Sequence, residues 1–382
     1  MDLKDLRIEL DHIDRQMVSL FEKRMRVCED VARYKIENNL PVLDASRERQ
    51  KLQSVADQLP EDLQEYGVSL YDLLMELSRS SQTRLMGSPT GLPAQIRDAI
   101  AQTEPLFPPN AMVACQGVEG AYSQQATEKL FRRPNVLYFS NFEGVFAAIE
   151  KGLCRYGVIP LENSTAGSVN MVYDLMMRHN FRIVRSVRLK VDHNLLAKNG
   201  AKLEDIREVY SHEQAIGQCS TFLQAHPEIK VVRCANTAEA AKFVSQSDRR
   251  DIAALSSRAC AELYGLQNLA PSCQDQGNNY TRFICISRDL EIYPGAERTS
   301  LMVVLPHRPG SLYKLLSRFY ALGINLNKLE SRPLPDRDFE FMFYFDLDTS
   351  VYSPQFLQLM GELDTVCESF TYLGSYSEVI CP

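Results

Sequence analysis

The sequence of 382 residues lacks several features that would narrow its class. It contains no tryptophan, none of its ten cysteines is paired at Cys-x-x-Cys spacing, and its six histidines form no metal-spaced pair. The cysteine pattern therefore favours reduced, buried thiols in a cytoplasmic protein over a disulfide framework or a zinc site. No run of about 18 apolar residues is present, so we expect no membrane span.

The sequence also lacks the features that are typical of nucleic-acid binding, of secretion and of dinucleotide binding. The net charge is −7, so no basic surface argues for nucleic acid. The first five residues are polar and lack the apolar core of a signal peptide. No Gly-x-Gly-x-x-Gly motif occurs, so NAD is not expected. No cofactor is predicted for this chain. Apolar residues make up 45% and charged residues 24%, as in a soluble globular protein, and the length predicts two to three domains.

Residues 2–38 are predicted to form one long helix, because apolar residues recur at alternating spacings of four and three. The repeating residues are Leu6, Leu10, Ile13, Met17, Leu20, Val27, Val31 and Tyr34. Arg24 interrupts this stripe, and a buried guanidinium is costly unless it is paired. Lys35 lies about 20° around the same face and roughly 16 Å along the helix. Two cations are therefore expected to face one interior.

Arg7 lies on a different side of the same helix. It precedes Arg24 by seventeen residues, which places it about 100° away around the axis. Arg7 therefore cannot join the interior of Arg24 and Lys35 from its own helix, but it could do so across a dimer.

Two further helices are predicted in the first ninety residues. Asp44 begins the second helix, with Arg47 and Glu48 in its first turn. The third helix is predicted over residues 62–86, where Ser78 and Gln82 are polar positions on an otherwise apolar face. The pattern alone fits either a helical hairpin or coiled-coil dimerisation module, or a pocket in an all-helical dimer that binds a small dianion.

The order of these polar residues resembles the all-helical class of chorismate mutase. The resemblance implies an intertwined dimer in which Arg7 reaches the partner's site, and a pericyclic reaction that needs clamping and hydrogen-bond donors. It implies that Lys35 and Gln82 bind the ether oxygen, that Asp44 and Glu48 orient the ring hydroxyl, and that Ser78 supports a carboxylate. Arg7, Arg24 and Arg47 are assigned to binding the carboxylates of chorismate, although Arg47 could instead brace its neighbours.

Residues 111–288 alternate between predicted strands and helices. A first set of strands lies near 112–115, 136–139 and 155–159, and residues 184–196 are predicted to cross to a second lobe. There the cycle restarts with strands at 206–210, 229–233 and 252–255 and helices at 213–225, 237–246 and 257–264, and a final strand follows at 282–287. Two α/β lobes with a cleft between them are the expected architecture.

Polar, turn-forming loops stand at the strand ends of this region. They are Gly117–Ser123, Pro160–Ser168, Ser211–Gln218 and the stretch that ends in Thr281-Arg282-Phe283. Helix capping alone would explain many such clusters. Read in order, however, they resemble prephenate dehydratase, which implies a two-lobed fold like that of periplasmic binding proteins.

The same resemblance implies roles for individual residues in decarboxylation and dehydration of prephenate. Thr281 is marked as essential, and it either donates a hydrogen bond to the leaving hydroxyl or relays a proton from Glu162 or His212. His212 is equally well explained as an ordinary loop histidine. Arg282 either pairs with a substrate carboxylate or braces the loop. The remaining substrate-binding residues implied are Glu162, Asn163, Thr165, Ser211, Gln214 and Gln218.

The C-terminal region has the predicted order βαββαβ, which is ferredoxin-like. Its strands are expected near 298–306, 324–331, 339–347 and 369–376, with helices between 311 and 322 and near 353–363. A plain dimerisation domain would fit this order. Two segments resemble the amino-acid-binding ACT domain, which implies phenylalanine binding between paired domains and feedback inhibition. The implied effector residues are Gly310, Ser311, Leu312, Glu330, Ser331, Arg332 and Pro333, with Ser311 where alanine is more usual.

The whole chain thus resembles a bifunctional chorismate mutase/prephenate dehydratase with a C-terminal ACT domain. The predicted domains are 1–88 for the helical module, 89–110 for a linker, 111–288 for the dehydratase and 298–377 for the ACT domain. The expected partners are chorismate and prephenate as substrates, phenylalanine as effector and a second copy of the chain. A ligand sensor and an enzyme that uses arogenate are the competing hypotheses.

Overall fold

The structure is a computed structural model that describes residues 2–87, 91–334, 337 and 340–381. The chain forms two compact units, and each is described by itself. The first unit consists of Met1–Asp98, Val303–Asn325 and Tyr352–Phe370, and the second of Ala99–Met302, Leu326–Val351 and Thr371–Pro382. The predicted boundary at residues 88 and 89 and the predicted strand start at residue 339 lie outside the described residues.

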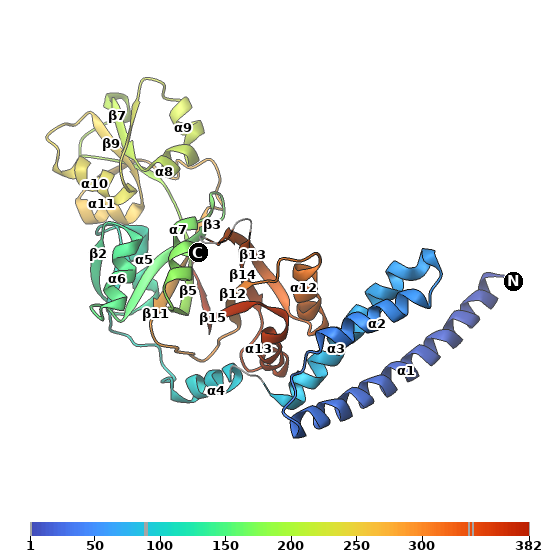
Figure 1. Ribbon diagram of the computed structural model, residues 1–382. Helices are drawn as coiled ribbons and strands as arrows, with labels where there is room; N and C mark the ends of the chain where they lie inside the picture. Colours follow the sequence, from blue (N-terminus) through green and yellow to red (C-terminus); the bar gives the residue numbers. More distant parts are fainter. Residues whose placement is uncertain (1, 88–90, 335–336, 338–339, 382) are drawn as a thin grey trace. The chain divides into compact units, whose positions relative to one another are not determined.

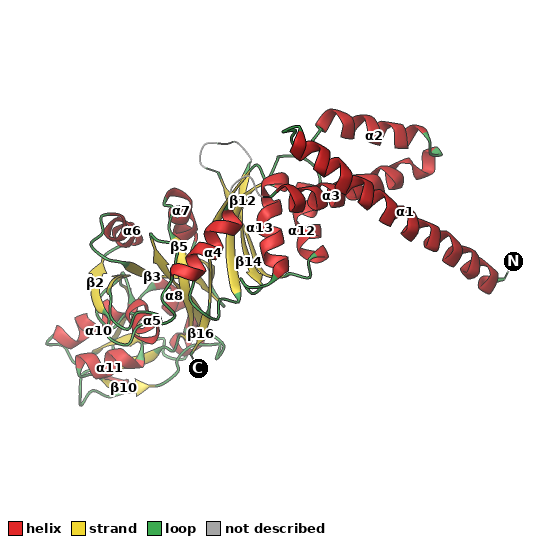
Figure 2. Cartoon of the chain, turned by 90° about the horizontal axis from the view of Figure 1, so that it is seen from below, coloured by secondary structure: helices red, strands yellow, loops and turns green. Residues whose placement is uncertain are grey.

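The first unit is built from helices, as Figure 2 shows for the N-terminal region. Asp2 caps its first helix by accepting hydrogen bonds from the backbone N–H groups of Lys4 and Asp5, and Asp44 caps the second through Arg47. The elements are α1 (Leu3–Glu37), α2 (Ala45–Asp57), a short 3₁₀ turn (Glu61–Leu63), α3 (Gln64–Met86), the start of α4 (Leu92–Gln102), α12 (Ser311–Ala321) and α13 (Pro354–Val366).

Helix α1 packs against α3 but leaves most of its apolar stripe exposed. Met17 is 50% exposed and Leu20 is 65% exposed, and Ala32 is the buried residue of the helix. Helix α3 also contacts the C-terminal helices, because Arg318 of α12 and Ser80 of α3 both donate hydrogen bonds to the buried carboxylate of Glu362 on α13. The exposed stripe is an apolar surface that this chain does not cover by itself.

The first lobe of the second unit is a mixed sheet with strand order β16-β5-β11-β3-β1-β2, and β4 pairs with β3. Figure 1 labels its strands β2, β3, β5 and β11. Its inner strands β1, β3 and β11 are buried on both faces over most of their length, as in a sheet covered by helices. The strands are β1 (Met112–Gln116), β2 (Asn135–Phe139), β3 (Tyr156–Asn163), β4 (Gly167–Ser168), β5 (Arg182–Lys190), β11 (Tyr280–Ser287) and β16 (Glu378–Ile380). The helices are α5 (Tyr122–Leu130), α6 (Phe142–Glu150) and α7 (Asn170–Arg178).

The second lobe is a five-stranded sheet with order β10-β6-β9-β7-β8. The chain enters it after β5 and returns through residues 271–279 into β11, so two short connections join the lobes. Its strands are β6 (Asn194–Ala197), β7 (Glu208–Ser211), β8 (Lys230–Arg233), β9 (Ile252–Ser256) and β10 (Gln267–Ala270). Its helices are α8 (Glu213–Gln218), α9 (Ser220–Gln224), α10 (Thr237–Gln246), α11 (Arg258–Tyr264) and a 3₁₀ turn (Leu203–Asp205).

The C-terminal region contains a four-stranded sheet with order β13-β14-β12-β15. Its strands are β12 (Arg298–Val304), β13 (Asn325–Pro333), β14 (Phe341–Asp348) and β15 (Ser369–Tyr376). With α12 and α13 in their places along the chain, the element order βαββαβ agrees with the prediction.

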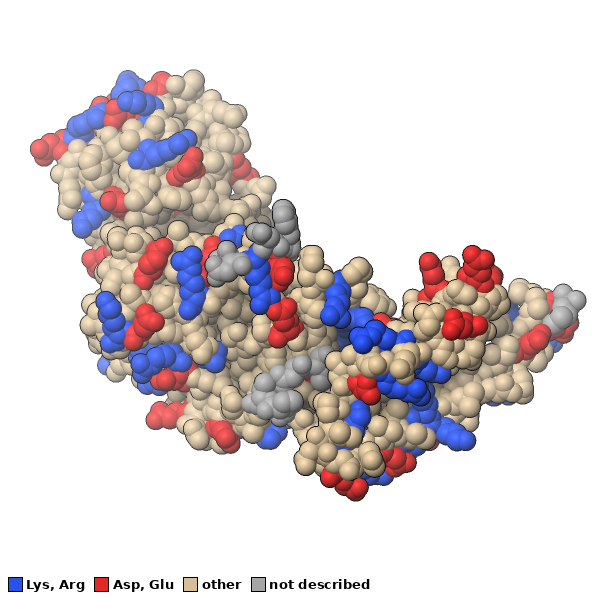
Figure 3. Space-filling model, viewed as in Figure 1, with Lys and Arg blue, Asp and Glu red and all other residues tan. Residues whose placement is uncertain are grey.

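On the face shown in Figure 3, basic and acidic side chains are interspersed over both lobes.

Several elements differ from the sequence prediction, and β6 and β10 of the second lobe are among those that were not predicted. The predicted helix 213–225 is two helices that meet at Cys219, and α7 and the short β4 were not predicted. The chain also continues past the predicted last strand into β16, which pairs in parallel with β5 and places Glu378 opposite Ser186. A three-residue strand has too few residues to show a periodic pattern, so pairing partners alone decide its existence.

Candidate active sites

Arg24 of α1 is held by α3 in the first unit. Its guanidinium donates hydrogen bonds to the hydroxyl of Ser78 and, at 3.0 Å, to the carbonyl of Leu74. The Ser78 hydroxyl in turn donates to the same Leu74 carbonyl at 2.6 Å. The break in the apolar stripe is therefore a half-buried cation whose hydrogen bonds go to two uncharged acceptors.

Lys35 lies on the same side of α1 as Arg24 and contacts the next part of α3. Its ammonium donates to the side-chain oxygen of Gln82 at 3.1 Å and to the carbonyl of Val42. Burial lowers the pKa of Lys35 from its usual value, against the opposing attraction of Asp44 and Glu48. The structure thus brings together Arg24, Lys35, Ser78 and Gln82, and places two carboxylates near the lysine.

Glu48 has a partner that sequence reasoning missed. Arg79 of α3 donates to both carboxylate oxygens of Glu48, and it lies 3.6 Å from Glu76. No local pattern marks Arg79, because it stands beside Ser78 on another side of the helix and meets Glu48 only through packing. Arg7 and Arg47 are exposed on α1 and α2.

The second unit contains a cleft with a volume of about 560 Å³ between its two lobes. The loops that the sequence singled out supply most of its wall. Lining residues from the first lobe include Gln116, Tyr122, Ser123, Asn163 and Thr281, and those from the connections and the second lobe include His193, His212, Gln214, Gln218 and Thr237.

Thr281 stands at the start of β11, directly opposite Asn163 on β3. The Asn163 amide donates to the Thr281 hydroxyl oxygen at 2.9 Å and to the side-chain oxygen of Asn279 at 2.7 Å. The Asn163 oxygen accepts from the backbone N–H of Thr165 at 3.0 Å and from that of Ala166 at 2.9 Å. Asn163 therefore holds both Thr281 and the turn that follows β3.

A second set of hydrogen bonds joins the lobes at Gln218. Its amide donates to the Thr165 hydroxyl at 2.8 Å, and its oxygen accepts from Asn279 at 2.9 Å and is bonded to His193 Nε2 at 2.9 Å. Burial lowers the pKa of His193, and the hydrogen bond to Gln218 opposes that shift. The sequence prediction did not name His193 or Asn279 as site residues. Asn279 belongs to the turn-rich stretch that precedes Thr281, whereas His193 lies in a connecting segment without a recognisable pattern.

Ser211 and His212 occupy different environments. The Ser211 hydroxyl is buried and donates to the carbonyl of Leu255 at 2.7 Å, so the prediction that it binds substrate conflicts with its position. The alternation of side chains along β7 directs it into the lobe. His212 lines the cleft and caps α8 by accepting from the backbone N–H of Gln214 at 3.3 Å.

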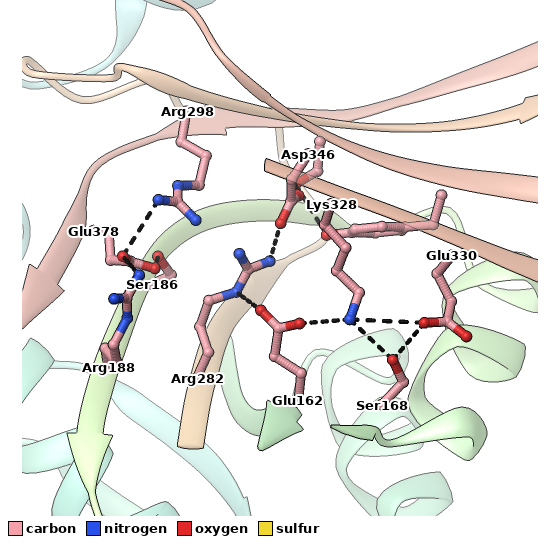
Figure 4. A network of polar contacts seen from close by, with 12 residues as sticks. Glu162, Ser168, Ser186, Arg188, Arg282, Arg298, Lys328, Glu330, Asp346 and Glu378 are labelled. Atoms are coloured by element: carbon pink, nitrogen blue, oxygen red, sulfur yellow. Dashed lines mark hydrogen bonds and ion pairs between the residues drawn. The ribbon is translucent and has the colours of Figure 1, made fainter. Parts of the chain in front are cut away.

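Glu162 and Arg282 are not among the residues that line the cleft, and Figure 4 shows their side chains directed toward Lys328 and Asp346. They are opposite each other on β3 and β11, with 3.3 Å between Glu162 Oε1 and Arg282 Nε. Arg282 is 4% exposed and pairs with Asp346 of β14; burial alone would lower its pKa, but Asp346 raises it well above the usual value. The assignment of both residues to the substrate therefore conflicts with the structure, and the bracing alternative for Arg282 fits.

The two predicted effector segments lie in different units. Gly310 has a φ of 82°, which favours glycine, and it directly precedes α12 with Ser311 and Leu312 in the first turn. Glu330 on β13 accepts a hydrogen bond from Ser168 at 2.6 Å, and Arg332 pairs with Asp174 of α7 at 2.9 Å. Ser331 and Pro333 belong to the same strand.

In the described ranges, no group of three or more His, Cys, Asp or Glu side chains is arranged to hold a metal ion. None of the helices described combines the length and the apolar character that a membrane span needs.

Two family models match this chain, one over each of the regions that contain the candidate sites. The family model for prephenate dehydratase matches residues 113–291, and the one for chorismate mutase type II matches residues 6–83. Arogenate dehydratase 2 of Petunia hybrida is 36% identical over 76% of this chain and 77% of its own length. The bifunctional chorismate mutase/prephenate dehydratase of Aquifex aeolicus is 28% identical over 99% of both chains. The solved prephenate dehydratase of Arthrobacter aurescens in complex with L-Phe is 27% identical, with a TM-score of 0.64 over 70% of this chain and 89% of that chain.

The fold and these matches define an enzyme in which an all-helical module precedes a two-lobed α/β domain. The chain belongs to the family of bifunctional chorismate mutase/prephenate dehydratases.

Proposed function

We propose that this chain rearranges chorismate to prephenate in its helical module and converts prephenate to phenylpyruvate in its two-lobed domain. The observation that carries the proposal is the presence of both sites in one chain. A cationic row on α1 faces polar groups on α3, and Thr281 lies in a polar cleft beside Asn163.

In the first reaction the protein holds chorismate in its compact conformer. Arg24 clamps a carboxylate, and Lys35 and Gln82 donate to the ether oxygen as its bond breaks, which stabilises the charge that develops there. The Lys35–Gln82 contact of 3.1 Å supports this pairing, because it places both groups at one point. Arg47 and the partner's copy of Arg7 complete the carboxylate site, Asp44 and Glu48 orient the ring hydroxyl, and Ser78 holds Arg24.

In the second reaction prephenate loses carbon dioxide and hydroxide, and the ring becomes aromatic. Because the Asn163 amide donates to the Thr281 oxygen, the Thr281 proton is free to donate to the departing hydroxyl. Of the two proton sources considered for a relay, His212 lines the cleft, whereas Glu162 is not among the lining residues and is bonded to Lys328. A proton from His212 would convert the departing hydroxide to water.

A homodimer and phenylalanine feedback complete the proposal. The exposed apolar stripe of α1 requires a partner surface, and a second copy would supply both that surface and Arg7. The L-Phe complex of the Arthrobacter aurescens protein supports phenylalanine as the effector, bound by the segments at Gly310 and Glu330. The ten free cysteines, most of them buried, favour a cytoplasmic location.

Arogenate is the alternative substrate for the second site, and the Petunia relative is named for it. Arogenate has an amino group at the position where prephenate has a keto oxygen. We favour prephenate because a chain that makes prephenate in its first module supplies the second site directly.

The deciding experiment gives chorismate to the purified full chain and follows prephenate and phenylpyruvate over time, with and without phenylalanine. We expect phenylpyruvate to form and phenylalanine to suppress it. Accumulation of prephenate without phenylpyruvate would support the mutase assignment and refute the dehydratase assignment. A parallel reaction with arogenate would then identify the alternative substrate.

A further inference from the structure

Two facing pairs of residues occupy the same segment of strands β3 and β11. Asn163 lies opposite Thr281, and the next position places Glu162 opposite Arg282. Because successive side chains on a strand point to opposite faces, the first pair meets the cleft and the second lies directly behind it. Movement of the second pair would therefore move the first.

The second pair is held by residues of the four-stranded sheet (Figure 4). Asp346 of β14 is fully buried and accepts from Arg282. Lys328 of β13 donates to Glu162 and, at 2.9 Å, to the hydroxyl of Ser168, which is opposite Glu162 on β4. One ammonium group thus joins both strands of the hairpin whose turn carries Asn163 and Thr165.

The surroundings of Lys328 restrict its side chain further. Its side chain is 15% exposed, and its nitrogen lies 5.6 Å from the centre of the Tyr173 ring and 3.7 Å from Glu330. A cation over an aromatic face and beside carboxylates is favoured there over water. The ammonium is consequently fixed in one place, as a positioning group must be.

We propose that Lys328 is a positioning residue for the dehydratase reaction, although it lies outside the two-lobed domain. By holding Glu162 and Ser168 together it fixes the β3–β4 turn, and through Asn163 it sets the direction of the Thr281 hydroxyl. The inference rests on the proposed dehydratase function. It assigns to the four-stranded sheet a part in turnover itself, in the absence of any effector.

Lys328 is the best position for a test, because its loss leaves the remaining charges partly paired. Glu162 keeps Arg282 as a partner, and Glu330 keeps the Ser168 hydroxyl. Substitution of Asp346 or Arg282 would instead leave a buried charge without its counter-ion and threaten folding.

The experiment compares Lys328→Met and Lys328→Arg with the unchanged full chain in steady-state kinetics on prephenate. For Lys328→Met we expect kcat to fall on the order of tenfold with KM changed less than about twofold, because orientation at the leaving hydroxyl matters chiefly in the transition state. Lys328→Arg retains the cation and should recover most of kcat. Mutase activity on chorismate, measured on the same samples, should stay unchanged and reports folding of the first unit, while an unchanged thermal unfolding transition by circular dichroism reports folding of the second.

A double variant tests the route through Glu162. If Lys328 acts by holding Glu162, then Glu162→Gln combined with Lys328→Met should be no slower than the slower single variant. Rates that multiply instead would overturn this route.

Asp174→Asn is the matched control. It removes the carboxylate that pairs with Arg332, a similarly exposed ion pair between the same strand β13 and the first lobe, but at α7 instead of at the catalytic strands. Its dehydratase kcat should stay within about twofold. Equal losses in the Asp174→Asn and Lys328→Met variants, or an unchanged kcat in Lys328→Met, would overturn the inference. Failure of the unchanged chain to form phenylpyruvate would instead refute the proposed function.

Discussion

The hydroxyl oxygen of Thr281 accepts a hydrogen bond from the Asn163 amide at 2.9 Å. That contact constrains the chemistry at this residue, because an oxygen that accepts from Asn163 can direct its own proton elsewhere. The arrangement fits a hydrogen-bond donor to a leaving group, and it does not require the threonine to ionise.

Thr281→Val is expected to abolish dehydration, because valine keeps the shape but removes the hydroxyl. The loss of one positioned donor typically costs about 10²–10³ in rate. Thr281→Ser keeps the hydroxyl and should retain a measurable fraction of phenylpyruvate formation from added prephenate. Mutase rates should be normal in both variants, and robust phenylpyruvate formation by Thr281→Val would refute the assignment.

Lys35→Ala is expected to reduce the first reaction by roughly 10²–10³, because a charged donor at the breaking ether bond is removed. Dehydration of added prephenate should be unaffected. Lys23→Ala is a suitable control, because Lys23 is an exposed lysine on the same helix. Chorismate consumption at a near-normal rate in Lys35→Ala would contradict the proposed role.

The pH dependence of the mutase should reflect the lowered pKa of Lys35. Burial favours the neutral amine, so the ammonium loses its proton at a pH below the ordinary 10.5. Activity that needs the ammonium is present below that lowered pKa and falls as pH rises through it. Lys35→Arg should shift the alkaline loss to higher pH in a profile of kcat/KM for chorismate, and an unchanged alkaline limb would exclude Lys35 as its source.

At the scale of elements, α1 needs a partner that its own chain does not supply. Its stripe continues along residues that are about half exposed or more, such as Leu10, Met17 and Leu20. Arg7 precedes Arg24 by seventeen residues on the same helix, roughly 26 Å along the axis, so the two cannot meet within one chain. An intertwined dimer would cover the apolar surface of α1 and would supply the missing cation from the partner chain.

A mixing experiment tests the shared site directly. Arg7→Ala and Lys35→Ala should each be inactive as mutases, because every site lacks one cation. After unfolding and refolding together in equal amounts, half of the dimers are mixed, and each mixed dimer has one complete site. We expect about one quarter of the normal mutase activity to return. No recovery, despite dimers in analytical ultracentrifugation, would show that Arg7 does not reach the partner's site.

At the scale of the whole molecule, strand β13 contains both an expected effector segment and direct bonds to the first lobe. Glu330 accepts from Ser168 and lies near Lys328, and Arg332 pairs with Asp174. An effector that engaged Glu330 and Arg332 would compete with these contacts. The strand is therefore a physical connection through which feedback could reach the catalytic turn.

Glu330→Gln is expected to weaken feedback by phenylalanine. Loss of the carboxylate should raise the phenylalanine concentration for half-maximal inhibition at least about fivefold, which corresponds to the lower range of allosteric coupling. Inhibition of phenylpyruvate formation gives the measurement, and calorimetric binding of phenylalanine shows whether affinity itself has changed. Inhibition indistinguishable from that of the unchanged chain would remove Glu330 from the effector site.

The sequence by itself determined the elements whose signals are local. The apolar repeat of α1 and its interruption at Arg24 follow from a helical period, and the turn-forming loops follow from residue types at strand ends. Family motifs then identified most of the cleft, including Asn163, Gln218 and Thr281, and the pattern of strands and helices predicted the C-terminal order βαββαβ. These features depend on residues close together in the chain.

The tertiary structure alone decided which face of each strand meets the cleft and which distant groups meet behind it. Alternation predicts that the side chains of Glu162 and Asn163 point in opposite directions. Only the packed sheet shows that Asn163 lines the cleft and that Glu162 accepts a hydrogen bond from Lys328. The pairing of Arg79 with Glu48 and the addition of β16 to β5 are equally invisible to local pattern. Such contacts join residues separated by tens to hundreds of positions, and side-chain packing in three dimensions selects them.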